Sequence, residues 1–109
     1  MIAKAETKFL RLSPRKVRDV VNLIRGKDVS RALVTLSHLR KRPVVSVEKT
    51  LRSAVANAGV KGVNSEQLYI SRITADEGAR WKRFRAAAFG RANRILKRTT
   101  HLKIELDIK

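Results

Sequence analysis

Cysteine is absent from this 109-residue sequence, and acidic residues, aromatic residues and long apolar runs are all scarce. Without cysteine the chain can form neither disulfide bonds nor a thiolate zinc site, so packing or a partner must hold the fold together. Nowhere do about 18 consecutive apolar residues occur, and the first residues lack the apolar stretch of a signal peptide. We therefore expect a soluble, cytoplasmic protein that does not insert into a membrane.

Residue types that perform catalysis are also few. His38 and His101 are the only histidines, and the nine carboxylates are scattered. The one adjacent acidic pair, Asp76-Glu77, precedes Gly78, and we interpret it as a solvated turn. No P-loop, GxGxxG or HExxH spacing occurs. The sequence thus predicts a protein that is not an enzyme and that needs no metal, no cofactor and no small-molecule substrate.

Positive charge is what the sequence has in excess. Its 26 Lys and Arg residues outnumber nine Asp and Glu residues, which gives a formal net charge of +17. The segment between Glu77 and Glu105 holds no carboxylate but nine basic residues: Arg80, Lys82, Arg83, Arg85, Arg91, Arg94, Lys97, Arg98 and Lys103. A block of one sign repels itself and becomes compact only beside a polyanion. The predicted partner is nucleic acid, since a membrane-binding helix needs more bulky aromatic residues than the 5% present.

Three helices are predicted in the first half of the chain. Ser13 and Pro14 are typical of an N-cap and a first helical position, and Gly26 ends the apolar pattern that follows. Asp28 begins a second pattern, and Pro43 opens a third. Helical spacing predicts that these side chains face inward: Val17, Val20, Val21, Ile24, Val29, Ala32, Leu33, Leu36, Leu39, Val47, Leu51, Ala54, Val55 and Ala58.

A small sheet is predicted from the remaining segments. The chain up to Leu12 has a β-leaning composition, residues 68–75 are rich in β-branched and aromatic side chains, and residues 102–109 alternate strictly between apolar and charged. The sequence has no repeat of 20 to 50 residues and no Pro/Ser-rich linker. We therefore predict one α+β domain over residues 1–109, with three helices packed on one face of a small antiparallel three-stranded sheet.

A long protruding β-hairpin is predicted at about residues 76–101. About 26 residues separate the last two strands, whereas most hairpin loops have about 2 to 5. Two extended arms of about 12 residues would carry a tip on the order of 40 Å from the domain. The small residues and the glycine of Ala86-Ala87-Ala88-Phe89-Gly90 permit a tight reversal there. Because an isolated two-stranded ribbon is only marginally stable in water, this hairpin needs support from outside.

The basic residues form three sets, which indicate nucleic-acid binding to different degrees. Arg11, Arg15, Lys16, Arg18, Arg25 and Lys27 surround the first predicted helix, where a solvated helix face explains them equally well. Arg40-Lys41-Arg42 lies between two helices and is somewhat better explained as a soluble loop. The hairpin set is different, because eight of its nine uncompensated cations lie on an element with little core, which would fray without phosphates beside it. Binding through this set should weaken steeply with salt.

Arginine is more frequent than lysine in the hairpin set, and this favours RNA. Guanidinium groups make two-pronged phosphate contacts and stack on unpaired bases, so folded RNA fits better than uniform duplex. Trp81, Phe84 and Phe89 alternate with the cations and can stack on bases or on each other. For Trp81 and Phe84 we weigh packing against RNA or the domain edge above base-specific readout.

Several motifs in order resemble one family. Ser13-Pro14-Arg15-Lys16-Val17-Arg18 and Leu23-Ile24-Arg25-Gly26-Lys27 resemble an N-terminal signature, and Ser53-Ala54-Val55-Ala56-Asn57-Ala58 resembles the end of a long helix. Ala88-Phe89-Gly90-Arg91-Ala92 and Ile95-Leu96-Lys97-Arg98-Thr99-Thr100-His101-Leu102 resemble a C-terminal signature. These are the motifs of the bacterial-type uL22 family of large-subunit ribosomal proteins, and the similarity spans essentially the whole chain.

The resemblance implies a structural constituent of the large ribosomal subunit. Such a protein binds and bridges large-subunit rRNA during assembly, and its basic hairpin lines the nascent-peptide exit tunnel. The implied partners are large-subunit rRNA, neighbouring large-subunit ribosomal proteins and the nascent peptide at the hairpin tip, in a ribosome of the cytoplasm or of an organelle.

The resemblance also implies roles for individual hairpin residues. The rRNA-binding positions are Arg80, Lys82, Arg83, Arg85, Arg91, Arg94, Lys97, Arg98 and His101, in addition to the set around the first helix. The tunnel-lining tip is Trp81, Arg85, Ala86, Ala87, Ala88, Phe89, Gly90 and Arg91, and the segment from Trp81 to Arg83 is associated with the response to macrolides. Family members commonly have Pro-Arg in place of Ala86-Ala87 and a polar or basic residue in place of Phe89.

Two alternatives of other classes remain at this point. A nucleoid- or histone-like protein would bind duplex DNA without sequence preference, and duplex DNA would then displace structured rRNA at equal salt. An RNA-processing nuclease would need a general base and usually a metal, and its RNA turnover would depend on Asp76, Glu77 or His101.

Overall fold

The computed structural model describes residues 2–78, 81–86 and 92–109, and it describes side chains for residues 2–78 and 98–109. One strand precedes the helices, and the other strands follow them. The elements are β1 (Ala3–Leu10), α1 (Pro14–Ile24), α2 (Val29–His38), α3 (Val44–Val60), the 3-10 helix η1 (Ser65–Gln67), β2 (Leu68–Glu77), β3 (Trp81–Ala86), β4 (Ala92–Lys97) and β5 (Thr100–Ile108).

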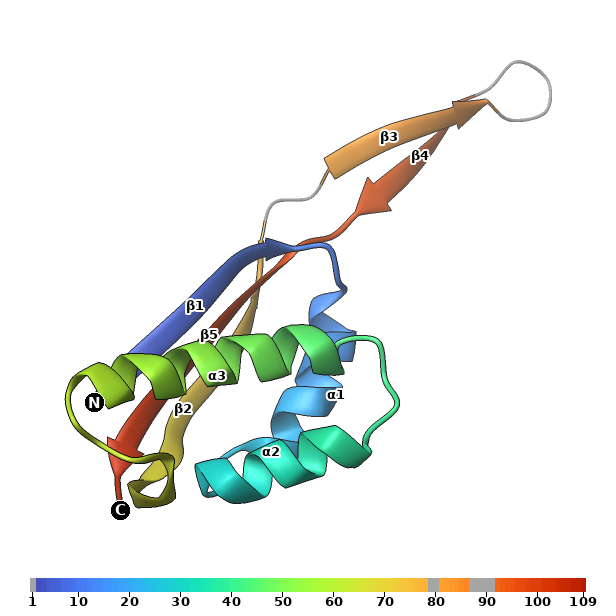
Figure 1. Cartoon of the computed structure of the whole chain (residues 1–109). Helices are drawn as coiled ribbons and strands as arrows, with labels where there is room; N and C mark the ends of the chain where they lie inside the picture. Colours follow the sequence, from blue (N-terminus) through green and yellow to red (C-terminus); the bar gives the residue numbers. More distant parts are fainter. Residues whose placement is uncertain (1, 79–80, 87–91) are drawn as a thin grey trace.

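The main sheet has three antiparallel strands in the order β1-β5-β2. The last strand therefore lies in the centre and pairs with both others: Ile104 is opposite Ala5 on one side and Ile73 on the other. All three helices cover the same face of this sheet (Figure 1). The predicted α+β architecture with three helices on one sheet face is confirmed.

The core lies between the helices and that sheet face. Successive strand residues point to opposite faces, so alternate residues of β5 (Leu102, Ile104 and Leu106) are buried under the helices. Ile108 continues the alternation but is 49% exposed, because it lies at the end of the strand. Most of the predicted inward-facing helix residues are fully buried, whereas Leu33, Leu39 and Val55 are only partly buried and pack against the core from its margin.

The helix starts follow the sequence signals, with two differences in detail. Ser13 is the N-cap of α1 and Pro14 its first residue, but the Ser13 side chain makes no capping hydrogen bond. Asp28 is the N-cap of α2 and likewise makes none; its Oδ2 lies 3.2 Å from Nζ of Lys109 instead. Pro43 is the N-cap of α3 rather than its first helical residue.

Side chains from the helices contact both outer edges of the sheet. On the β1 edge, Nδ2 of Asn57 donates to the carbonyl oxygen of Lys4 at 2.8 Å, and Nζ of Lys61 donates to that of Ile2. On the β2 edge, Arg18 of α1 and Arg25, the C-cap of that helix, donate to carbonyl oxygens in the same way. Because unpaired edge groups invite pairing with another strand, these contacts protect the sheet from edge-to-edge association.

The strands β3 and β4 form a separate antiparallel pair, with Trp81 opposite Lys97 and Ala86 opposite Ala92. This pair extends away from the main sheet beyond the ends of β2 and β5 (Figure 1), and the molecule measures 62 Å along its long axis against 25 and 16 Å across. The pairing agrees with the predicted hairpin. The interpretation of Asp76-Glu77 as a turn was wrong: both residues end β2, where Asp76 is opposite His101.

Candidate nucleic-acid interface

The helix α1 separates its apolar and basic residues onto different sides. Its apolar residues, such as Val17 and Val20, are buried against the sheet, so the two residues between each such pair lie on the outer side of the helix. All six predicted binding residues around this helix are exposed: Arg11, Arg15, Lys16, Arg18, Arg25 and Lys27. The segment from residue 11 to residue 42 contains ten basic residues and two aspartates, so this part of the surface is strongly positive.

Arg18 and Arg25 differ from the rest of that set because they hold the helix to the sheet. Nε of Arg18 donates to the carbonyl oxygen of Ala75 at 2.9 Å, and Nη1 of Arg25 donates to that of Ile73 at 2.6 Å. Nη2 of Arg25 also lies 3.4 Å from Oδ1 of Asn22. A guanidinium has five N–H donors, so these bonds leave other donors for a ligand. The two arginines therefore have a structural role that sequence reasoning did not predict.

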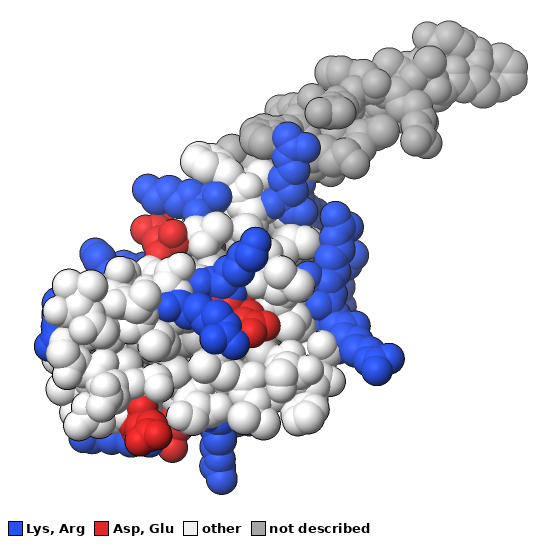
Figure 2. Space-filling model, viewed as in Figure 1, with Lys and Arg blue, Asp and Glu red and all other residues white. Residues whose placement is uncertain are grey.

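The loop between α2 and α3 adds Arg40, Lys41 and Arg42, all exposed. Figure 2 shows a column of Lys and Arg side chains along one edge of the domain, on the side of α1 and this loop, with further Lys and Arg side chains elsewhere on the drawn face and few Asp or Glu side chains. Two sets that are separate in the sequence therefore lie on the same side of the fold. Their combination makes a phosphate-binding role stronger than either set does alone.

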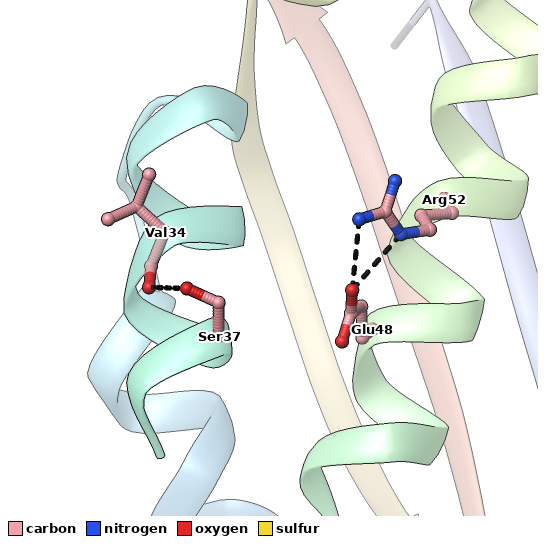
Figure 3. A network of polar contacts seen from close by, with 4 residues as sticks. All are labelled: Val34, Ser37, Glu48 and Arg52. Carbon is pink, nitrogen blue, oxygen red and sulfur yellow. Dashed lines mark hydrogen bonds and ion pairs between the residues drawn. The ribbon is translucent and has the colours of Figure 1, made fainter.

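The one carboxylate of α3 is neutralised within its own helix. Nε and Nη2 of Arg52 lie 3.1 and 3.0 Å from Oε1 of Glu48, one turn earlier (Figure 3). On α2, Oγ of Ser37 donates to the carbonyl oxygen of Val34 at 2.6 Å, also within one turn. Both contacts are local to one helix, so neither adds net negative charge to this side of the molecule.

The open face of the main sheet has a different charge pattern. Cross-strand pairing forms rows in which charges alternate: Lys4 is opposite Glu105, which is opposite Arg72, and the next row places Glu6 opposite Lys103. Four of the nine carboxylates lie on this face, and they are Glu6, Asp76, Glu105 and Asp107. Opposite charges in facing positions attract each other, so the middle of this face is nearly neutral and a poor phosphate-binding surface.

His101 lies where β2 and β5 lead toward β3 and β4, and its ring contacts β1. The backbone N–H of Phe9 donates to Nδ1 of His101 at 3.2 Å, and the two rings meet edge to face with centroids 4.8 Å apart. Phe9 has φ 57°, an uncommon value for a residue with a large side chain. Sequence reasoning did not select Phe9, because no local signal marks a left-handed residue in a β-leaning segment.

The predicted hairpin residues are only partly covered by the structure. Arg80, Ala87, Ala88, Phe89, Gly90 and Arg91 lie outside the described residues. In β3 are Trp81, Lys82, Arg83, Arg85 and Ala86, and in β4 are Arg94 and Lys97. The register places Arg83 opposite Ile95 and Arg94 opposite Phe84, so basic residues are distributed along both strands. Arg98 follows β4 and is exposed.

The described residues show no group of three or more His, Cys, Asp or Glu that could hold a metal ion. Within the same part of the chain, no helix combines the length and apolar character that a membrane crossing requires.

Comparison with known proteins identifies the class and then the family. Residues 5–107 match the family model described as ribosomal protein L22p/L17e. The chain is similar to the large ribosomal subunit protein uL22 of Sulfurihydrogenibium sp. (strain YO3AOP1), with 47% identity over 98% of this chain and 92% of the relative. It is also similar to the proteins of that name from Oceanobacillus iheyensis, with 49% identity over 100% and 97%, and from Desulfatibacillum aliphaticivorans, with 45% over 98% and 99%.

The chain therefore belongs to the bacterial-type uL22 family of large-subunit ribosomal proteins, whose members are structural components of the ribosome and not enzymes. The resemblance inferred from the motifs is confirmed.

Proposed function

We propose that the chain binds and bridges large-subunit rRNA during assembly, and that its basic hairpin lines the nascent-peptide exit tunnel. The observation that carries the rRNA part is the separation of charge over the molecule. The side formed by α1 and the α2–α3 loop has a large excess of Lys and Arg, whereas the open sheet face contains nearly balanced charges. A surface of one sign beside a neutral one gives a polyanion one preferred side on which to bind.

On the domain, the proposed phosphate-binding residues are Arg11, Arg15, Lys16, Arg18, Arg25 and Lys27. On the hairpin they are Arg80, Lys82, Arg83, Arg85, Arg91, Arg94, Lys97 and Arg98. Phosphates along the hairpin would neutralise its charges and stabilise an antiparallel pair that has little core of its own. His101 enters this proposal as a residue at the base of the hairpin, opposite Asp76, and its ring contact with Phe9 supports an indirect role.

The shape of the molecule supports the bridging role. A domain with a basic side and a basic two-stranded extension can contact RNA segments that are far apart, and each contact neutralises phosphates that would otherwise repel. Neighbouring large-subunit proteins would contact the rest of the domain surface. On the hairpin, Trp81 and the residues from Arg85 to Arg91 would line the tunnel and meet the nascent peptide.

The test compares the full chain with a variant that lacks residues 80–98, replaced by a short turn. Binding to protein-free large-subunit rRNA is measured at several salt concentrations. The slope of log affinity against log salt should fall by about 0.7 to 0.9 for each phosphate that the variant no longer engages. We expect a weaker affinity and a shallower slope for the variant. An unchanged affinity and slope would contradict a role of the hairpin in rRNA binding.

A second measurement separates rRNA binding from general attraction to polyanions. Duplex DNA competes with the rRNA at equal salt, and we expect it to displace the protein poorly because uniform duplex lacks unpaired bases and folded shape. Efficient displacement would favour the DNA-binding alternative. A tagged copy of the chain should also sediment with large ribosomal particles at high salt.

A further inference from the structure

Phe9 is an aromatic residue that the structure holds at the surface. Its side chain is 52% exposed, and among the described residues it is the only one other than glycine with a positive φ. A single exposed apolar side chain is ordinary in itself. A bulky residue held in a left-handed conformation is not, because its Cβ crowds the backbone there, and such residues gather at functional sites.

The surrounding structure accounts for this conformation. The pairing of β1 with β5 shifts register between Thr7 and Leu10, so Phe9 lies in an irregular stretch outside the regular ladder. Its N–H therefore has no strand partner and donates to Nδ1 of His101 instead. On the far side of Phe9, Oγ1 of Thr100 donates to the carbonyl oxygen of Leu12 at 2.7 Å. The backbone is thus held at Phe9 and again at Leu12, and the Phe9 ring itself contacts the ring of His101 edge to face.

The charges near the ring are of the kind that phosphates require. Lys8 and Arg11 flank Phe9 in the sequence. Arg98 lies three positions before His101, and the ring of His101 contacts that of Phe9. All three basic side chains are exposed. Two carboxylates lie at the neighbouring positions of β2, on the other side of β5 from β1: Asp76 is opposite His101, and Glu77 is opposite Thr100. On its own side of β5, Phe9 is directly preceded by Lys8 and followed two positions later by Arg11.

We propose that the ring of Phe9 stacks on an unpaired nucleobase of the rRNA, with His101 as the residue that positions the ring. Lys8, Arg11 and Arg98 would neutralise the adjoining phosphates. An unpaired base offers a flat face that a fixed aromatic ring can cover at little entropic cost, whereas paired bases hide their faces in the duplex. This inference rests on the proposed function and adds a specific contact to it.

A fluorescence experiment tests the stacking directly. Trp81 is the only tryptophan, so the W81F background is free of tryptophan and can receive one at a chosen position. In W81F/F9W, we expect protein-free large-subunit rRNA to quench the emission of the introduced indole. The matched control is W81F/V60W, because Val60 is 89% exposed at the end of α3 and outside the proposed interface. Unchanged emission of the position 9 indole on saturation with rRNA would overturn the stacking.

Affinity measurements separate the ring from the fold. Glycine accepts φ 57° without strain, so F9G should fold at least as well as the parent chain yet bind rRNA more weakly, by about 5- to 100-fold if one base is no longer stacked. F9Y retains the ring and should bind like the parent, whereas F9L retains apolar bulk alone and should bind like F9G. If F9L binds as well as the parent, the site is an ordinary apolar contact, such as one with a neighbouring protein, and the proposal is wrong.

The role of His101 has its own pair of variants. The side-chain oxygen of H101N can accept the Phe9 N–H in place of Nδ1, and H101F retains a ring without an acceptor. We expect H101N to retain most of the rRNA affinity and H101F to bind as weakly as F9G. Equal affinities of the two would show that the acceptor does not position the ring. If the parent chain itself does not bind large-subunit rRNA, the proposed function is wrong. If the parent binds and the Phe9 and His101 variants all bind with the same affinity as the parent, only the stacking proposal is wrong.

Discussion

The amide N–H of Gly78 donates a 2.9 Å hydrogen bond to the carbonyl oxygen of Thr99, and a Cβ on Gly78 would lie 2.5 Å from Oγ1 of Thr99. The same Cβ would lie 3.0 Å from Nε2 of His101. This contact extends the pairing of β2 and β5 by one step beyond Glu77 and Thr100, in the direction of β3 and β4. The close approach leaves no room for a side chain at residue 78.

We predict that G78A destabilises the protein by about 1 to 3 kcal/mol, because the added methyl group must displace Thr99 or the strand itself. Urea unfolding followed by circular dichroism measures the change. The matched control is G59A in α3, where a Cβ would meet nothing within 4 Å and where alanine is the better helix former. We expect G59A to be neutral or stabilising. Equal stabilities of the two variants would contradict the close contact.

Removing the Arg25 guanidinium should lower the free energy of unfolding by about 1 kcal/mol, since the carbonyl oxygen of Ile73 then has only solvent as a partner. The control is R15A in α1, where Arg15 is exposed and the change is expected to stay within about 0.5 kcal/mol of the parent. In the double variant R18A/R25A the β2 edge is open, so self-association in analytical ultracentrifugation should rise. A monomeric double variant of parental stability would show that these bonds do not protect the edge.

In the central strand, I104A should destabilise the fold by about 2 to 5 kcal/mol, because Ile104 is fully buried between the helices and both neighbouring strands. I108A makes the same chemical change on the same face of β5, but Ile108 is half exposed and its replacement should cost about 1 kcal/mol or less. Thermal unfolding compares the two. Similar costs would mean that the core does not extend under β5 as described.

Charge removal at two places should affect rRNA binding unequally. R15Q/K16Q removes two cations from α1, and K4Q/R72Q removes two from the open sheet face, so the net charge changes equally. We expect the first pair to weaken binding and to reduce the salt slope by about 0.7 to 0.9 for each phosphate no longer engaged, and the second to have little effect. Equal effects would point to unspecific attraction by net charge and against an interface at α1.

Much of this architecture follows from local patterns. Ser13-Pro14 marked the start of α1, the spacing of Val17, Val20 and Ile24 marked its buried side, and the alternation from Leu102 marked β5. Such patterns are readable because neighbours along one helix or strand decide them. The excess of basic residues likewise indicated a nucleic-acid partner, and the ordered motifs indicated the family.

Contacts between distant segments could not be read in this way. Phe9 and His101 are 92 positions apart, and Arg25 contacts a carbonyl oxygen 48 positions away. The composition of Asp76-Glu77 is typical of a turn, yet pairing with β5 makes both residues part of a strand. In each case the deciding partner comes from another part of the chain.

The amino-acid sequence by itself determined the composition of charge, the positions of the helices, the alternation of the last strand and the membership in the uL22 family. Only the tertiary structure decided which arginines bind the sheet edge, which sheet face is neutral and which aromatic ring is held at the surface. The physical reason is that periodicity and net charge are properties of the chain alone, whereas a hydrogen bond or a shared surface requires two segments to meet in space.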